Sequence, residues 1–405
     1  MEFGGTDQLR MTQASPASLV PSLGPGGHTF RAGEVQVLRW QMVINEIAAI
    51  FCHVRRRHAS RTAILPPRPV AGHAPAKPFK GPELKKTAVI GAGLAGLACA
   101  RIMRRAGCFV EVFEQDRIIG GRVATTRLGL TPFDHGAQYI TARSDGFRTY
   151  IDELVNASYA RRWVPLTADG QEARQMLPWF VGTPGMSSLV RPLAEGVRIH
   201  TSRQVHSLER SPKGWFLRFE DESSVGPFHA VAIATPAPEA KLLVGRMEEL
   251  AAPLERVRIA PCWAVMARTE ERVLPTQDVF SDMNEVVRWV ARNNGKPTRS
   301  SRGDHVVIHA SPGWSRETAE VEPEVVASEM WNEVCNILNL PPTRPAQLSA
   351  HLWKNGLVES SLGETYLFSS KHMVGIAGDW CLGRMAEHAF ESGTRLGKTI
   401  VDALD

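Results

Sequence analysis

The spacing of apolar positions first becomes regular near residue 87. Residues 87–90 form a short apolar run, glycines follow, and residues 94–106 place apolar side chains at helical spacing. Gly107 ends this helical pattern, and a second apolar run covers residues 109–113. Strand, turn, helix and strand in this order predict the start of an α/β unit with a parallel sheet.

The remainder of the chain continues as a mixture of strands and helices. Residues 323–338 form the clearest helix, with Val326, Met330, Val334 and Leu338 four residues apart. Residues 212–214 (Pro-Lys-Gly) predict a hairpin turn. A final strand is expected over 373–377 and a final helix over 386–404. The other predicted strands cover residues 198–201, 204–209, 215–220, 230–234, 262–268, 286–291 and 306–311.

The first 85 residues differ from the rest in composition. They contain Pro/Gly/Ser-rich stretches at 15–27 and 66–82, a basic cluster at 55–58, and one candidate helix over 35–52. This composition is typical of a disordered extension or of upstream sequence added by a wrong start site. A targeting or membrane-surface segment is the alternative interpretation.

Charge separates the same two regions. The chain has a net charge of +5, yet the first 85 residues alone hold 11 basic and 5 acidic residues. The remainder is therefore close to neutral, and we expect no nucleic-acid partner for it. The six cysteines show no CxxC or zinc spacing, so we expect reduced thiols, a cytoplasmic location and no metal site. No apolar run approaches about 20 residues, so we expect no membrane span.

Three glycines join the first predicted strand to its helix. Gly91, Gly93 and Gly96 have the Gly-x-Gly-x-x-Gly spacing, which permits a tight turn, close approach to a diphosphate and close helix–strand packing. The helix N-terminus also presents free N–H groups to phosphates. Glu114 ends the next strand 23 residues after Gly91, where an acid accepts hydrogen bonds from an adenosine ribose. The spacing predicts a dinucleotide site without separating FAD from NAD.

Two further motifs favour FAD. Gly120, Gly121 and Arg122 follow Glu114, and a Gly-Gly-Arg at this place lies beside the flavin diphosphate and ring in flavoproteins of the glutathione-reductase-like group. Near the C-terminus, a strand ends in Gly-Asp, and Asp379 can accept a hydrogen bond from a ribityl chain. The helix that follows would stabilise negative charge developing on the flavin. Residues 232–236 are similar to the strand and turn that pack near FAD in this group.

With these motifs, the chain resembles the bacterial renalases and their relatives in the flavin amine oxidase superfamily. The most specific strings are Asp-His-Gly-Ala-Gln-Tyr at 134–139 and Gly-Asp-Trp-Cys-Leu at 378–382. The resemblance runs from about residue 86 to the C-terminus. The matching stretches are residues 87–122, 134–143, 181–187, 226–228, 232–237, 308–310, 314–315 and 378–382.

The resemblance implies an α/β fold with two domains. One is a Rossmann-type FAD-binding domain of the glutathione-reductase and p-hydroxybenzoate-hydroxylase kind, and the other is a smaller, mostly antiparallel α+β substrate domain. The first would comprise residues 86–145, 190–240 and 366–405, and the second residues 146–189 and 241–365. The implied reaction oxidises the 2- and 6-dihydro isomers of NAD(P)H to NAD(P)+, using non-covalent FAD and reducing O2 to H2O2.

The resemblance and the motifs together predict the site residues. The residues expected to contact FAD are Gly91, Gly93, Ala95, Gly96, Glu114, Gln115, Gly121, Arg122, Ala137, Gln138, Val205 and Asp379. Those expected to bind the substrate are Gln138, Tyr139, Ile140, Thr141, Ala142, Trp179 and His309. Within the site, Gln138, Tyr139, His309 and Trp353 are the candidates for positioning the reacting ring.

A dihydropyridine is already a hydride donor, so such a site needs orientation and exclusion of water more than an acid–base dyad. Two other functions remain open: an amine oxidase or desaturase-like flavoprotein of the same fold, and a flavin-fold protein that binds a ligand without turnover. Lys354 could instead hold a water near the flavin, and Cys381 could anchor it. The chain departs from the family pattern at residues 384–388, where Arg384 and His388 add bulk.

Overall fold

The computed structural model describes residues 84–167, 177–299 and 301–405. These residues belong to a compact unit that runs from Lys80 to Asp405. The helix expected over 35–52 and nearly all of the predicted N-terminal extension lie outside the described residues.

A six-stranded sheet carries the glycine motif. Its order is β17-β18-β11-β1-β2-β7, and every neighbouring pair is parallel except β17–β18. Such strands are buried on both faces, which explains why the sequence shows continuous apolar runs here. The strands are β1 (Lys86–Ile90), β2 (Phe109–Phe113), β7 (Arg198–His200), β11 (Ala230–Ile233), β17 (Leu367–Ser369) and β18 (Val374–Ile376).

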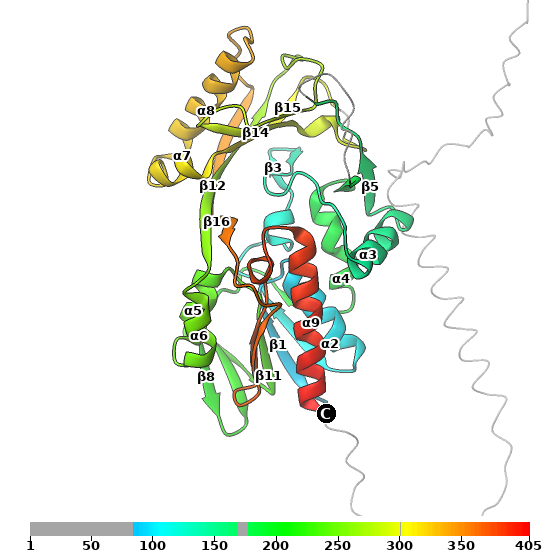
Figure 1. Ribbon diagram of the computed structural model, residues 1–405, viewed down its shortest axis with the longest axis vertical. Helices are drawn as coiled ribbons and strands as arrows, with labels where there is room; N and C mark the ends of the chain where they lie inside the picture. Colours follow the sequence, from blue (N-terminus) through cyan, green and yellow to red (C-terminus); the bar gives the residue numbers. More distant parts are fainter. Residues whose placement is uncertain (1–83, 168–176, 300) are drawn as a thin grey trace, which may run out of the picture. The chain divides into compact units, whose positions relative to one another are not determined.

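Two helices pack against each other on one side of this sheet. They are α2 (Leu94–Arg105) and α9 (Ala386–Leu404), which lie side by side in Figure 1. A Cβ atom added at Gly393 of α9 would lie only 1.9 Å from the carbonyl oxygen of Ala95. The backbones therefore approach so closely that glycine is required. Helices α3 (Asp145–Asn156) and α4 (Arg191–Ala194) complete this layer.

A three-stranded antiparallel sheet covers the other side. It consists of β8 (Val205–Ser211), β9 (Gly214–Phe219) and β10 (Ser224–Phe228), with helices α5 (Ala237–Val244) and α6 (Glu248–Leu254) nearby. The expected hairpin turn after residue 211 joins β8 to β9. Phe113, Trp215, Phe228 and Trp380 share the core between the two sheets.

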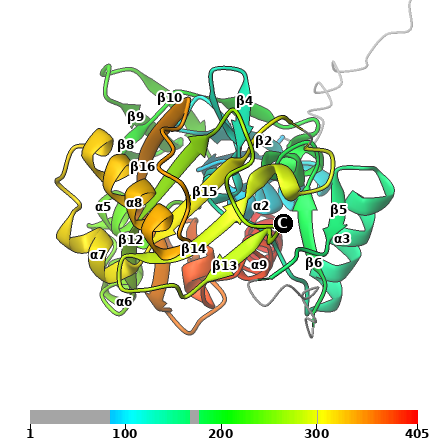
Figure 2. The same ribbon diagram turned by 90° about the horizontal axis from the view of Figure 1, so that it is seen from above.

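A separate five-stranded sheet has the order β13-β14-β15-β12-β16 and is antiparallel throughout. Helices α7 (Pro312–Glu317) and α8 (Pro323–Ile337) lie along one of its sides (Figure 2). We call the other face, which carries Trp289, His309 and His351, the roof face. The strands are β12 (Arg258–Arg268), β13 (Val279–Ser281), β14 (Val287–Arg292), β15 (His305–Ala310) and β16 (Gln347–Ser360).

The remaining elements are short. They are η1 (Gly121–Val123), β3 (Thr126–Leu128), β4 (Thr131–Phe133), β5 (Ala160–Trp163), β6 (Trp179–Gly182), η2 (Met186–Val190), η3 (Asn293–Gly295) and η4 (Asp379–Cys381). The division of the chain into FAD and substrate domains at the boundaries given above stays a prediction.

Candidate functional site

The glycine-rich turn leaves backbone amides facing open space. Gly91 has φ +99°, and a Cβ atom there would lie 2.7 Å from the Ala234 carbonyl oxygen. A Cβ atom at Gly96 would lie 1.9 Å from the Gly91 carbonyl oxygen, so both positions require glycine. At Gly93, by contrast, a Cβ atom would meet no described atom within 4 Å. Gly93 is the N-cap residue of α2, and no described side chain caps that helix, so its first amides are available to a diphosphate.

Glu114 lies beside this turn at the end of β2. One carboxylate oxygen accepts the Ala92 N–H at 2.7 Å and the other accepts the Asp116 N–H at 3.0 Å. Burial raises the pKa of Glu114, although these two amide hydrogen bonds oppose the rise. Each carboxylate oxygen can accept a second hydrogen bond, so the residue fits ribose hydroxyls as predicted. Gln115 next to it is exposed.

The two flavin motifs, far apart in the sequence, meet in an ion pair. The Arg122 Nη2 lies 2.6 Å from the Asp379 Oδ1, although 257 positions separate the residues. Gly120 is bridged to Gly93, and a Cβ atom at Gly121 would lie 3.6 Å from the Gly93 Cα. The structure therefore brings the glycine turn, the Gly-Gly-Arg and the Gly-Asp to one place.

The other predicted FAD contacts lie around the same turn. Ala95 is buried in the first turn of α2, and Val205 is nearly buried at the start of β8. The Arg203 N–H, two residues before Val205, donates to the Glu114 carbonyl oxygen at 2.8 Å. Thr235, which follows β11, has a buried hydroxyl with no hydrogen-bond partner in the described part of the chain. An unpartnered buried hydroxyl of this kind fits a site that a polar cofactor completes.

The loop of residues 134–139 is fixed against Arg122. The Ala137 N–H donates to the Arg122 carbonyl oxygen at 2.8 Å, and a Cβ atom at Gly136 would lie 2.1 Å from that oxygen. Gln138 is only 6% exposed, and its amide nitrogen donates to the carbonyl oxygens of Asp134 and Gly136. Its amide oxygen accepts from Lys296 at 3.1 Å. Both ends of the Gln138 amide therefore have hydrogen-bond partners within the protein, and Gln138 stabilises the conformation of the loop.

A buried charge cluster lies behind this loop, and the sequence analysis missed it. Asp134 Oδ2 lies 3.0 Å from the Lys296 ammonium and 2.7 Å from the Arg299 guanidinium, and all three side chains are almost fully buried. Burial alone would raise the pKa of Asp134, but Lys296 and Arg299 hold it below its ordinary value. Burial also lowers the pKa of Lys296 to about 8, against the opposing effect of Asp134. Asp134 is far in the sequence from Lys296 and Arg299, so no short motif indicates that the three side chains meet.

The roof face places rings over the same loop. Cross-strand pairing aligns Trp289, His309, Ala264 and His351 in one row across β14, β15, β12 and β16. The His309 Nε2 lies 3.1 Å from the His135 carbonyl oxygen, which also accepts the Trp353 indole N–H at 3.1 Å. Trp353 and His309, both predicted for the site, therefore converge on one atom of the loop.

This contact fixes the protonation of His309. A carbonyl oxygen can only accept, so the proton lies on Nε2 and Nδ1 of the neutral ring is an acceptor. Burial lowers the pKa of His309 to about 4, partly opposed by its hydrogen bond to His135. Burial likewise lowers the pKa of His135 to about 3. Both rings are neutral near pH 7, and His135 Nδ1 is buried with no described partner.

Aromatic side chains form the remaining wall. Tyr139 and Trp179 stack with ring centroids 3.6 Å apart, and Trp289 lies 5.8 Å from Tyr139. Ile140 and Ala142 are buried in the core, whereas Thr141 is partly exposed. Of the residues predicted to bind the substrate, Tyr139 therefore presents a stacked ring, whereas Ile140 and Ala142 pack into the core.

Other candidates have different surroundings. Lys354 is exposed on β16, and Arg384 is exposed before α9. The His388 Nδ1 accepts the Met385 N–H at 3.4 Å, so this departure from the family pattern caps α9. Cys381 is fully buried, and burial raises the pKa of its thiol to about 12.

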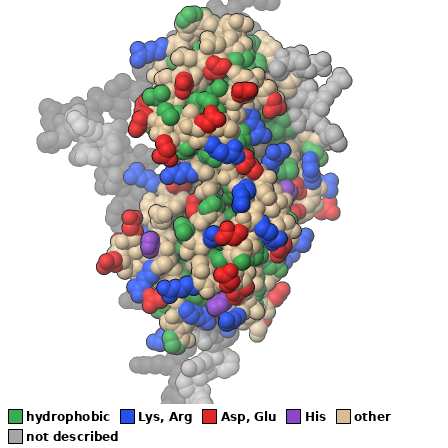
Figure 3. Space-filling view, turned by 60° about the vertical axis from the view of Figure 1, so that its left-hand side comes forward, with side chains coloured by type: hydrophobic (Ala, Val, Ile, Leu, Met, Phe, Trp, Pro, Cys, Tyr) green, Lys and Arg blue, Asp and Glu red, His purple; other side chains and the backbone are tan. Residues whose placement is uncertain are grey.

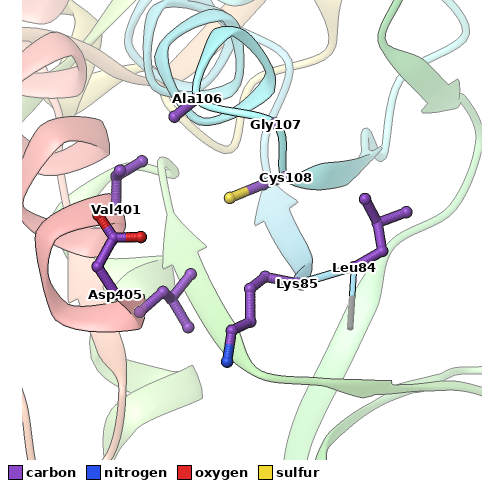
Figure 4. A pocket seen from close by; sticks show the side chains of 8 residues that line it. Leu84, Lys85, Ala106, Gly107, Cys108, Val401 and Asp405 are labelled. Atoms are coloured by element: carbon purple, nitrogen blue, oxygen red, sulfur yellow. The ribbon is translucent and has the colours of Figure 1, made fainter. Parts of the chain in front are cut away.

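Cavities are also present among the described residues. One, of about 160 Å³, is lined by the ends of α2 and α9 and includes Lys85, Cys108 and Asp405 (Figure 4). It contains none of the predicted site residues. Another, of about 380 Å³, lies beside the buried charge cluster and includes Arg272, Lys296 and Arg299.

Within the described ranges, no group of three or more His, Cys, Asp or Glu side chains is arranged to hold a metal ion. The same part of the chain contains no helix long and apolar enough to cross a membrane. On the face shown in Figure 3, basic and acidic side chains of the described residues are interspersed.

The glycine turn, acidic strand end and arginine–aspartate pair define a flavoprotein of the Rossmann class. Comparison with family models agrees: residues 89–154 match the NAD(P)-binding Rossmann-like domain, and residues 156–396 match the flavin containing amine oxidoreductases. The chain belongs to the flavin containing amine oxidoreductase family, as a renalase-like member. It is an FAD-dependent oxidoreductase, which confirms the fold class, cofactor and superfamily predicted from the sequence.

Individual relatives support the same assignment. Mouse renalase is 25% identical over 304 residues, which cover 69% of this chain and 87% of that protein. The Mycobacterium tuberculosis protein named "Putative flavin-containing monoamine oxidase AofH" is 35% identical over 91 residues. That match spans 22% of this chain and only 18% of the relative's length.

A solved structure extends the comparison to the fold. Cyclohexylamine oxidase from Brevibacterium oxydans is similar with a TM-score of 0.62 and 14% sequence identity. The similarity covers 80% of this chain and 100% of the oxidase. It shows the fold alone, because the identity is so low.

Proposed function

We propose that this enzyme oxidises the 2- and 6-dihydro isomers of NAD(P)H to NAD(P)+ by hydride transfer to FAD, with O2 reduced to H2O2. One observation carries the proposal: His309, above the loop of residues 134–139, donates to the carbonyl oxygen of His135 within it, and burial keeps both rings neutral. With pKa values of about 4 and 3, His309 and His135 are too weak to take a proton from an alkylammonium group near pH 7. A dihydronicotinamide needs no such base.

The chemistry balances without an acid–base pair. Loss of a hydride from C2 or C6 converts the dihydropyridine ring into an aromatic pyridinium, and no substrate proton has to be removed first. Bound FAD supplies the two-electron acceptor and, with O2, the route to H2O2. The work left to the protein is orientation of the ring and exclusion of water.

The described residues suit that work. The stacked pair of Tyr139 and Trp179 offers an aromatic surface for a flat ring. The His309 Nδ1 would accept a hydrogen bond from the carboxamide N–H of a nicotinamide. Gln138 and Trp353 would act indirectly, because their hydrogen bonds hold the loop of residues 134–139. Glu114, Arg122, Asp379 and the amides of α2 would hold FAD.

The test is aerobic turnover of the purified holoenzyme with borohydride-reduced NAD+, a mixture of dihydro isomers. We expect oxygen uptake, with NAD+ and H2O2 formed in equal amounts and the 2- and 6-dihydro isomers removed selectively. Pure 4-dihydro NADH is the matched control and should react far more slowly. Turnover of a panel of primary and polyamines, with the dihydro isomers left untouched, would replace the proposal with an amine oxidase.

A further inference from the structure

The strand β14 contains an irregularity next to the aromatic wall. Its pairing with β15 runs regularly from Arg292 to Trp289, but Val287 then pairs with Ala310, one position further on β15. Arg288 is therefore an extra residue, with no partner in the ladder. Val287 packs in the core with α8, and Trp289 lies on the roof face, so the bulge releases Arg288 from the alternation between them. Its charge acts on Tyr139 and His309, which places its side chain on the roof face.

The effects of Arg288 on its surroundings agree with this position. Burial has the largest effect on three nearby groups: it raises the pKa of Tyr139 and of the Cys262 thiol and lowers the pKa of His309. The positive charge of Arg288 has a smaller, lowering effect on the pKa of each. These three residues come from the loop of residues 134–139, from β12 and from β15. The guanidinium therefore lies near the point where the loop and the roof face meet.

The Arg288 side chain has no partner among the described residues. It is partly exposed, and within the described residues its side chain makes no ion pair or hydrogen bond. Arg292, on the same strand, shows the contrast. Its guanidinium binds the Asp304 carboxylate at 2.9 Å, and it donates to the Leu274 and Thr276 carbonyl oxygens. An arginine of a stable core is satisfied in this way, whereas Arg288 keeps its donors available.

We propose that Arg288 binds a phosphate group of the substrate and so selects an anionic nucleotide over a cationic amine. The inference rests on the proposed function, because it assigns the nucleotide part of a dihydronicotinamide to this residue. A guanidinium offers paired donors that match phosphate oxygens. It would repel a protonated amine in the same space, and this repulsion adds specificity beyond the attraction.

The test is a binding titration of the oxidised holoenzyme, followed by flavin absorbance. The ligands are NAD+, nicotinamide mononucleotide and nicotinamide riboside, which carry two, one and no phosphate groups. The wild type should bind both phosphorylated ligands more tightly than the riboside. Arg288→Gln should weaken NAD+ and the mononucleotide about 10- to 100-fold, as expected for loss of a charge-assisted hydrogen bond, and leave the riboside within twofold. Arg288→Lys should restore part of the affinity.

The matched control is Arg344→Gln, which removes the same charge from an exposed position before β16. It should change none of the three affinities by more than twofold. Equal NAD+ affinity for the wild type and Arg288→Gln would overturn the assignment, as would an equal loss for all three ligands. A wild type that oxidises no dihydronicotinamide but shows the phosphate-specific loss would retain the Arg288 site and remove the proposed reaction. If the wild type oxidises dihydronicotinamides normally and Arg288→Gln binds all three ligands as the wild type does, the proposed reaction stands and the Arg288 assignment is wrong.

Discussion

Two regions of the site offer different kinds of group to a ligand. We call the first the floor: it consists of the backbone amides of the glycine turn, Glu114 and the Arg122–Asp379 pair. The roof face and the loop of residues 134–139 below it present side chains: neutral histidines, the stacked rings of Tyr139 and Trp179, and Arg288, whose guanidinium has no partner among the described residues. Backbone geometry serves a cofactor that must always be held, whereas side chains can be exchanged when the substrate changes.

The first prediction removes the charge that supports the loop between these two regions. Asp134→Asn leaves Lys296 and Arg299 buried without a carboxylate, which should lower the free energy of unfolding by about 3–5 kcal/mol. Urea unfolding at saturating FAD measures the change. Glu153→Gln, in the surface pair of Arg101 and Glu153, is the control and should cost less than about 1 kcal/mol. A loss at Asp134 no larger than at Glu153 would show that the cluster does not support the loop.

The second prediction concerns Gly93, where glycine is needed for space beside a ligand and not, as at Gly91 and Gly96, for packing within the protein. Gly93 has φ −76°, which alanine adopts freely, and its added methyl group would enter space that no described atom occupies. Gly93→Ala should fold normally but bind FAD at least tenfold more weakly, because the methyl group meets the diphosphate. Flavin retention and a Kd from fluorescence titration measure this. Gly146→Ala, which also meets no described atom, should leave FAD affinity unchanged; an equal loss there would refute the floor assignment.

The third prediction concerns the roof face and pH. The folded-state pKa of His309, about 4, lies below its ordinary value of 6.5, so the unfolded chain binds more protons between these values. Stability from this group is therefore complete above pH 6.5 and is lost as the pH falls towards 4. His309→Asn should flatten the pH dependence of the free energy of unfolding over this window. His206→Asn, at an exposed position of β8, should leave the slope unchanged. An unaltered slope for His309→Asn would mean that the ring is not held neutral.

The same contrast explains what could be predicted from the sequence. Most of the floor comes from residues close together in the chain. The sequence therefore predicts the glycine turn, the role of Glu114 and the strands β1, β2 and β11. Helix α9 was predicted with its observed bounds. The pairing of Arg122 with Asp379 was not foreseen, although both residues had been selected.

The roof face and the elements around it were harder to predict from the sequence. Strand β16 was missed because Lys354, Asn355 and Gly356 interrupt its apolar pattern and most of its positions are only partly buried. Helix α3 was also missed, although Phe147, Tyr150, Ile151 and Leu154 are buried at helical spacing. The position of Arg288 depends on a register shift between β14 and β15, and a strand's own sequence does not reveal the register of its partner.

The measurement that tests the central claim most directly is anaerobic mixing of the holoenzyme with borohydride-reduced NAD+, followed by visible flavin absorbance. Without O2, the half-reaction is isolated from reoxidation. The account predicts rapid bleaching by the isomer mixture and little change with pure 4-dihydro NADH. A flavin that stays oxidised with the mixture, but bleaches with an amine, would contradict it.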